Sequence, residues 1–122
     1  PKAIKNAKKN AKMHRAKIFA FRSNLFENVK GKFDLIIFNA PYIPVDEDLS
    51  YSLFQNGENI IERFLYECKR FLKNNGRVLI LVSSLSSFRV PRFLRKRLLE
   101  KKRLDWEELR IYEFKIRKNR SN

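Results

Sequence analysis

Asn39, Ala40, Pro41 and Tyr42 are four consecutive residues whose types could together hold a planar NH2 group. The amide oxygen of Asn39 and a neighbouring backbone carbonyl are two acceptors for the two hydrogens of a side-chain amide or an adenine amino group. The ring of Tyr42 can stack on the plane of that group. Such a site would aim the nitrogen at an electrophilic methyl by positioning and hydrogen bonding, without a strong base. The candidate catalytic residues are therefore Asn39, Pro41 and Tyr42, and Ala40 joins them as a candidate substrate-binding residue.

The residues before this segment predict how it is positioned. Phe33 to Phe38 is an apolar run that only Asp34 interrupts, which is typical of a strand buried on both faces. Pro41 and Pro44 cannot continue a central strand, so the chain is expected to turn out at the strand's carboxyl end. In helix-flanked parallel sheets, ligands bind at that end. The predicted position and the predicted chemistry therefore agree.

The rest of the chain predicts alternating helices and strands. The spacing of apolar residues predicts helices at 1–17, 58–72 and 91–102, and strands at 18–21, 77–83 and 109–116. Gly76 marks the end of the second helix, and Pro91 the start of the third. This order is typical of an α/β domain with a mostly parallel sheet flanked by helices. We expect one domain over residues 1–116, followed by a basic tail at 117–122.

Several segments resemble one family of enzymes. FDLIIFNAPYIP (33–44) is similar to the FDLIxxNPPYIP segment of the HemK-like protein methyltransferases, which methylate the glutamine amide of translation release factors. The stretches NGENIIERFLYECKRFLKNNGRVLILVSS (56–84), DWEELRIYEF (105–114) and PKAIKNAKKNAK (1–12) resemble further parts of the family. The likeness covers nearly the whole chain, and is closest to the compact archaeal and eukaryotic branch.

The resemblance implies a Rossmann-like class I methyltransferase fold with S-adenosyl-L-methionine (AdoMet) as cofactor. It assigns cofactor binding to Asn24, Leu25 and Asn39. The chain departs from the family pattern at two of its site positions. Ala40 replaces the family's first proline, and Asn24 replaces the aspartate of a turn that holds the adenine amino group.

The resemblance also implies that the first strands of the fold are absent. The chain has only three glycines, Gly31, Gly57 and Gly76, and no Gly-rich turn precedes Pro1 to cradle the cofactor. A fragment of a longer methyltransferase, inactive by itself, is the favoured interpretation, and a decayed copy is the alternative. The short stretch between Leu99 and Glu108 further suggests that one late strand is reduced or missing.

Two other functions remain open at the level of sequence. An adenine-N6 methyltransferase acting on DNA or RNA would use the same amino-group geometry, and the net charge of +15 favours it. The Ile43-Pro44 continuation and the Asn56-Gly57 turn favour the protein enzyme. A non-catalytic basic module that binds nucleic acid or the ribosome is the alternative from another class.

Residues 89–103 carry a dense band of positive charge. Eight of these fifteen residues are Lys or Arg, which favours contact with the ribosome or nucleic acid, although a solvated helix face would show the same pattern. The compact branch of the family further implies a small zinc-binding activator subunit as a partner.

Cys68 is the only cysteine, so the sequence predicts neither an internal disulfide nor a Cys-rich metal site. The longest apolar run is far shorter than the ~20 residues of a membrane span, and no membrane contact is expected. These features fit a cytoplasmic protein, and the resemblance implies a translation release factor as its protein substrate.

Overall fold

A computed structural model describes residues 2–15, 18, 23–40, 54–55 and 58–118. The chain divides into two compact units, residues 1–30 and residues 31–122, and each is described by itself. Of the predicted site residues, Asn24, Leu25, Asn39 and Ala40 lie among the described residues. Pro41 and Tyr42 lie outside them.

The first unit contains helix α1 (Lys2–Met13), which confirms most of the helix predicted at 1–17. Its few apolar side chains share one side, and no residue of the helix is buried. The predicted strand at 18–21 falls almost entirely outside the described residues. A tight turn follows at 23–28, held by the hydroxyl of Ser23, which donates to the carbonyl of Leu25 (2.8 Å) and accepts from the backbone N–H of Asn28 (2.9 Å).

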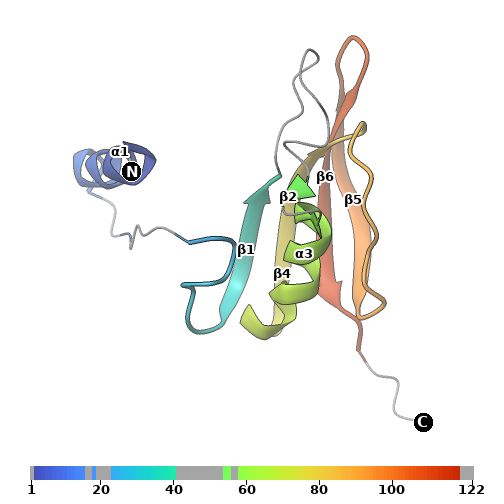
Figure 1. Ribbon diagram of the computed structural model, residues 1–122, viewed down its shortest axis with the longest axis horizontal. Coiled ribbons are helices and arrows are strands. Elements are labelled where there is room, and N and C mark those ends of the chain that lie inside the picture. The colour runs from blue at the N-terminus through green and yellow to red at the C-terminus, as the bar shows by residue number, and fades with distance from the viewer. Residues whose placement is uncertain (1, 16–17, 19–22, 41–53, 56–57, 119–122) are drawn as a thin grey trace. The chain divides into compact units, whose positions relative to one another are not determined.

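The second unit is built on a four-stranded sheet with the order β1-β4-β6-β5 (Figure 1). Its strands are β1 (Phe33–Asn39), β4 (Leu72–Ser83), β5 (Leu94–Arg103) and β6 (Glu108–Ile116). β1 runs parallel to β4, whereas β6 runs antiparallel to both β4 and β5. Two short strands, β2 (Phe54–Gln55) and β3 (Glu58–Asn59), form a separate antiparallel pair. Among the described strands, the sheet is therefore mixed rather than mostly parallel.

Helix α3 (Ile60–Glu67) and a short 3₁₀ helix (Cys68–Phe71) follow β3 and pack on one face of the sheet (Figure 1). The helix buries an apolar stripe against the sheet, and the Phe64 ring stacks on that of Phe38 in β1 with centroids 4.3 Å apart. Val78, Ile80 and Phe114 are fully buried, and because cross-strand partners share a face, they lie on this covered side. This is the core that holds β1, β4 and β6 in register. The helix predicted at 58–72 is confirmed, except that its two ends belong to β3 and β4.

The opposite face of the sheet is open among the described residues. Leu35 and Ile37 alternate with the covered residues of β1 and are 42% and 70% exposed. The expectation that Phe33 to Phe38 is buried on both faces is therefore wrong for the residues described here. The physical reason is that the second unit places its described helices on one side only.

The helix predicted at 91–102 is wrong, because these residues form β5. Leu94 and Leu98 are four residues apart and lie on the same, covered face, as the alternation of side chains along a strand requires. A register shift between Leu98 and Glu100 then interrupts this alternation. That bulge made the apolar spacing look helical. The late strand that was expected to be reduced or missing is therefore present as β5.

Cys68 is fully buried beneath the sheet, and this burial raises the pKa of its thiol to about 12. We expect the thiol to resist iodoacetamide in the native chain at pH 8 and to react at once in urea.

The pKa of the same thiol in the unfolded chain is about 8.5. Between this pH and about 12 the unfolded state loses a proton that the folded state keeps, so the free energy of unfolding should fall as pH rises. Urea titrations of the chain and of Cys68→Ala at pH 7 and pH 10 would measure this, and an equal pH response in both would contradict it.

Candidate active site

Asn39 is the last residue of β1, and its Cα pairs with that of Leu81 in β4. The next residue, Ala40, is buried and donates its backbone N–H to the carbonyl of Leu81 over 3.1 Å. This bond holds the backbone one residue past the strand before the chain leaves the sheet. The side chain of Asn39 is exposed at the carboxyl end of β1, so its amide oxygen is accessible to a ligand. This is the position that the sequence predicted for it.

The hydrogen bond of Ala40 gives a physical reason for alanine at this position. Proline has no N–H, so Ala40→Pro would remove the bond to Leu81 in a buried place. We expect the free energy of unfolding to fall by about 1 kcal/mol or more, because the lost bond outweighs the ~0.4–1 kcal/mol that proline gains from a stiffer unfolded chain. Urea denaturation of the chain would measure it, with Ala40→Ser as a control that keeps the N–H. A stabilised proline variant would contradict the expectation.

Pro41 and Tyr42 lie outside the described residues, as do Ile43, Pro44 and the Asn56-Gly57 turn. The proposed stacking of Tyr42 on a substrate amide therefore stays a prediction. Of the four residues predicted to bind the substrate, the structure places Asn39 and Ala40.

Asn59 is a second amide near this end of the sheet, and it was not predicted. Its side-chain oxygen caps α3 by accepting from the backbone N–H groups of Ile61 (3.0 Å) and Glu62 (3.2 Å). Its amide nitrogen donates to the carbonyl of Ser87, 2.8 Å away in the loop after β4. Asn59 thus ties the start of the helix to that loop. The sequence carried a signal for the cap, since Asn59 precedes an apolar run and Glu62 follows three residues later.

Two substitutions separate the two roles of Asn59. Asn59→Asp keeps the capping oxygen but removes the donor to Ser87, whereas Asn59→Ala removes both. We expect the alanine variant to lose about 1–2 kcal/mol of stability and the aspartate variant to lose less, since the cap itself contributes ~1 kcal/mol. Thermal unfolding followed by circular dichroism would measure both. Equal losses would show that the tie to Ser87 outweighs the cap.

The β5–β6 hairpin lies at the same end of the sheet as Asn39, because β6 is antiparallel to β4 (Figure 1). Ser83, the last residue of β4, donates its hydroxyl to the buried carboxylate of Glu107, and the backbone N–H of Ser84 donates to the carbonyl of Glu108 (2.7 Å). These bonds fix the hairpin against the end of β4. Its tip surrounds a hollow of about 630 Å³ and carries Trp106, which is 62% exposed. The hairpin therefore carries an exposed aromatic side chain at the same end of the sheet as the candidate site.

Asn24 and Leu25, the predicted cofactor residues, lie in the turn of the first unit. Leu25 has a positive φ of 54°, a conformation that costs a leucine free energy and that the bonds to Ser23 maintain. The backbone carbonyl of Asn24 accepts from the N–H of Glu27 (3.2 Å), and its side chain is exposed. The turn therefore presents a neutral amide that can accept a hydrogen bond. It belongs to a different unit from Asn39.

Neither a cluster of metal-ligand side chains nor a membrane-spanning helix occurs among the residues that the structure describes. No three side chains of the His, Cys, Asp or Glu types come together there as metal ligands. None of the helices in the described ranges is long and apolar enough to cross a bilayer.

Comparisons with known proteins agree with this geometry. Residues 1–105 match the family model described as "Methyltransferase small domain". A Methanocaldococcus jannaschii protein, provisionally named as a protein N5-glutamine methyltransferase, is 47% identical over 94 residues, which are 70% of this chain and 48% of that protein. A release factor glutamine methyltransferase from Streptococcus pneumoniae is 29% identical over 82% of this chain and 40% of its own length. The chain thus spans about half of the length of these relatives, or less.

The fold also resembles a solved structure. A crystal structure of a Haemophilus influenzae protein, provisionally called a methylase, matches with a TM-score of 0.50 and 18% identity over 90% of this chain and 65% of that one. This likeness supports a Rossmann-like methyltransferase fold, with which the mixed sheet and the helix on its face are consistent. The matched residues include β1 and Asn39 at its carboxyl end. The chain therefore belongs to the methyltransferase small domain family, and its relatives place it with the HemK-like proteins.

Proposed function

We propose that the protein containing this chain transfers a methyl group from AdoMet to the side-chain amide nitrogen of a glutamine, with a translation release factor as its substrate. The observation that carries the proposal is the exposed side chain of Asn39. Asn39 is the last residue of β1, at the carboxyl end of the strand, where this family's segment is expected to bind an NH2 group. The names of the relatives from Methanocaldococcus jannaschii and Streptococcus pneumoniae support a glutamine target.

Asn39 would work by orientation. Its side-chain oxygen would accept one N–H of the target amide, and a backbone carbonyl at Ala40 or Pro41 would accept the other, so the nitrogen is held with one face free for the methyl. Tyr42 would stack on the amide plane and exclude water. AdoMet supplies the electrophilic methyl. The residues of the segment would hold and orient the amide nitrogen, and the N–H proton that the methylated amide gives up would pass to solvent.

The resemblance assigns cofactor binding to Asn24 and Leu25 of the Ser23–Asn28 turn and to Asn39, and the chemistry of the turn supports the first two. The exposed amide of Asn24 can accept a hydrogen bond from the adenine amino group, and Leu25, held half-buried with a positive φ, can contact the adenine. A neutral amide fits this task as an aspartate would, with a weaker bond because its oxygen carries no charge. The three glycines of this chain are isolated from one another, so the printed sequence contains no Gly-rich turn.

A methyl-transfer assay with two substrates tests the proposal. The longest protein that the gene encodes would be incubated with methyl-labelled AdoMet and either a release factor or an adenine-containing oligonucleotide. We expect label at a glutamine of the release factor, located by mass spectrometry. The release factor with this glutamine replaced by asparagine is the matched control. Label in the oligonucleotide alone would favour adenine-N6 methylation, and no heat on titration of AdoMet would favour the non-catalytic binding module.

Three further expectations belong to this proposal. A release factor acts in the cytoplasm, so we place the protein there. A small zinc-binding activator subunit of the kind associated with the compact branch is proposed as a partner, and co-expression followed by co-purification tests it. Contact of β5 with the ribosome or nucleic acid is supported by charge, since residues 95–97 and 101–103 of this exposed strand are all Lys or Arg.

A further inference from the structure

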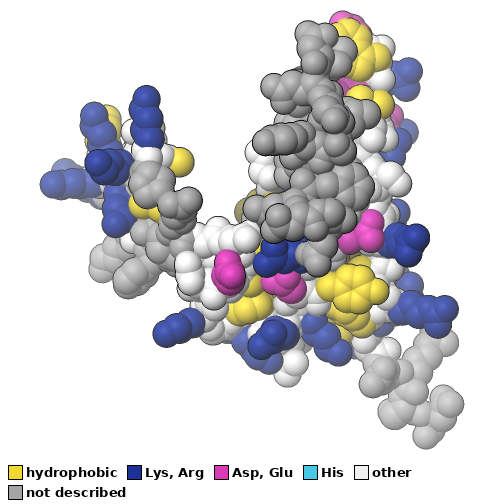
Figure 2. All heavy atoms as spheres, in the orientation of Figure 1, with side chains coloured by type: hydrophobic (Ala, Val, Ile, Leu, Met, Phe, Trp, Pro, Cys, Tyr) yellow, Lys and Arg dark blue, Asp and Glu magenta, His cyan; other side chains and the backbone are white. Residues whose placement is uncertain are grey.

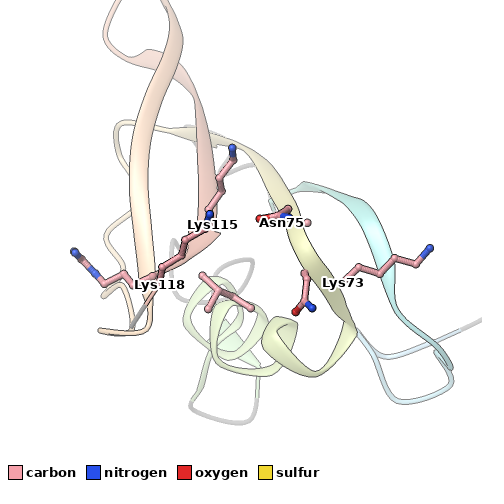
Figure 3. Close-up of a pocket in the computed structure, with 8 residues that line it drawn as sticks. Lys73, Asn75, Lys115 and Lys118 are labelled. Carbon is pink, nitrogen blue, oxygen red and sulfur yellow. The ribbon is translucent and has the colours of Figure 1, made fainter. Parts of the chain in front are cut away.

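A basic pocket lies at the end of the sheet away from Asn39. It has a volume of about 340 Å³ and is lined by the start of β4 and the end of β6: Lys73, Asn74, Asn75, Gly76, Lys115, Ile116, Arg117 and Lys118 (Figure 3). Asn75 and Leu81, the partner of Asn39, are separated by about 20 Å along β4 at the usual rise of a strand. The pocket is therefore separate from the candidate active site.

A bulge in β4 builds one wall of this pocket. Phe33 of β1 pairs with Leu72, but Leu35 pairs with Arg77, so three extra residues of β4 loop out between the two pairs. Asn75 adopts a positive φ of 65° within this bulge. At Gly76 a Cβ atom would lie 2.9 Å from the backbone oxygens of Phe33 and Lys73, so only glycine allows the strands this approach. The pocket is thus a product of fixed backbone geometry.

The lining is strongly positive. Four of its eight residues are Lys or Arg, and none is acidic. Figure 3 shows Lys115 and Asn75 on facing sides of the space between β6 and β4, whereas Lys73 extends toward β1, where it meets Asp34 at 3.5 Å. Among the described residues, no ion pair involves Lys115, Arg117 or Lys118. These three cations are therefore available to an anion.

The positive surface continues from the pocket onto β5. Lys115 also lines a smaller hollow of about 110 Å³ together with Arg95, Arg97 and Glu113. The only carboxylate there, that of Glu113, is already held by Arg77 at 3.1 Å. Figure 2 shows Lys and Arg side chains along the β5 side of the sheet.

Two cations also face each other directly. Arg95 and Lys115 are cross-strand partners in the β5–β6 ladder. Like charges directly opposite each other destabilise an antiparallel pair. A bound anion with more than one negative group would offset this repulsion. Two hollows that share Lys115 offer more than one place for a negative group, which suits the successive phosphates of a polynucleotide better than one isolated anion.

We propose that this surface, defined by Asn75, Arg95, Lys115, Arg117 and Lys118, binds the phosphodiester backbone of RNA. The cations neutralise consecutive phosphates, and the Asn75 side chain adds a hydrogen bond to one of them. Binding here depends on charge and not on base sequence. It leaves the carboxyl end of β1 open, so RNA and a methyl acceptor can be bound together.

Fluorescence anisotropy with a labelled single-stranded RNA of mixed sequence tests this proposal. The double variant Lys115→Gln/Lys118→Gln is expected to bind about tenfold more weakly at low salt, and to lower the slope of log K against log salt by about 1.4, which is about 0.7 for each lost contact. The matched control is Lys5→Gln/Lys8→Gln, which removes the same charge from α1 in the first unit. It should change affinity less than twofold.

The remaining outcomes distinguish the alternatives. Equal weakening by the control variant would show an effect of net charge alone and would overturn the site. Displacement of RNA by millimolar inorganic phosphate at constant ionic strength would point to a pocket for a small oxyanion and would overturn the polynucleotide. Circular dichroism and thermal unfolding of both variants confirm that the exposed substitutions leave the fold intact, so that weaker binding reports on the surface.

Discussion

Replacing Asn39 with alanine is expected to lower the kcat for methyl transfer by about 10²–10³-fold, the usual effect of removing one preorganised hydrogen-bond partner from a reacting group. The reason is geometric. Asn39 is fixed at the end of β1 by the ladder to β4 and by the bond from Ala40 to Leu81, so its oxygen is placed before the substrate arrives. KM should change much less than kcat, because the protein substrate makes most of its contacts elsewhere. Steady-state kinetics of the longest encoded protein with the release factor would measure both constants.

The control for this experiment lies two residues earlier on the same strand. Ile37 is 70% exposed, and Ile37→Ala should leave kcat within about twofold because surface substitutions away from a site have small effects. Asn39→Asp is a second variant, which keeps an acceptor but adds a negative charge and so tests whether the site needs a neutral oxygen. An Asn39→Ala enzyme with an unchanged kcat and a raised KM would assign Asn39 to ground-state binding and contradict its catalytic role.

The position of Asn39 could be predicted from sequence because its determinants are local. An apolar run followed by two prolines predicts a strand and the point where the chain leaves the sheet. β1 ends at Asn39, two residues before the first of these prolines. The same holds for α1, for α3 and for β6, whose apolar spacing extends over a full element. Local pattern and tertiary structure agree in these segments.

The features that were missed depend on partners far away in the chain. Asn59 and Ser87 are 28 residues apart, and Ser83 and Glu107 are 24 residues apart, so neither bond has a signal in the spacing of residues. β5 was predicted as a helix because its strand identity comes from pairing with β6 along nearly its whole length, and the bulge after Leu98 hides its period of two. Tertiary hydrogen bonds decide these cases.

The basic band at 89–103 shows the consequence of that error for function. On a helix, its cations would surround the axis, with part of the charge turned to the core side. In the structure, most of these cations lie on β5, which is the outer strand of the described sheet. Lys and Arg on such a strand also protect its edge from pairing with another chain. Arg95 and Lys115 become neighbours only in this strand pairing. The sequence pointed to contact of the band alone with the ribosome or nucleic acid, whereas the proposed RNA-binding surface joins Arg95 of the band to residues of β4 and β6.

The largest effect on stability is expected at Phe114, which is fully buried on the covered face of β6 opposite Val78. Phe114→Ala should lower the free energy of unfolding by about 3–5 kcal/mol, because it leaves a cavity in a core that α3 covers from one side only. Domains of this size have about 5–15 kcal/mol in total, so the variant should be close to unfolding at 37 °C. Urea denaturation at 25 °C would give the loss, and Phe114→Leu, which keeps most of the volume, should lose much less.

Ile37→Ala is the matched control on the opposite face of the same sheet. Because Ile37 is mostly exposed and makes no part of the covered core, we expect a loss of at most about 0.5 kcal/mol in the 122-residue chain. The contrast of the two substitutions reports how unequally the two faces contribute to stability. A loss at Ile37 comparable to that at Phe114 would mean that the face carrying Leu35 and Ile37 is covered in solution, and the description of a sheet stabilised from one side would then be wrong.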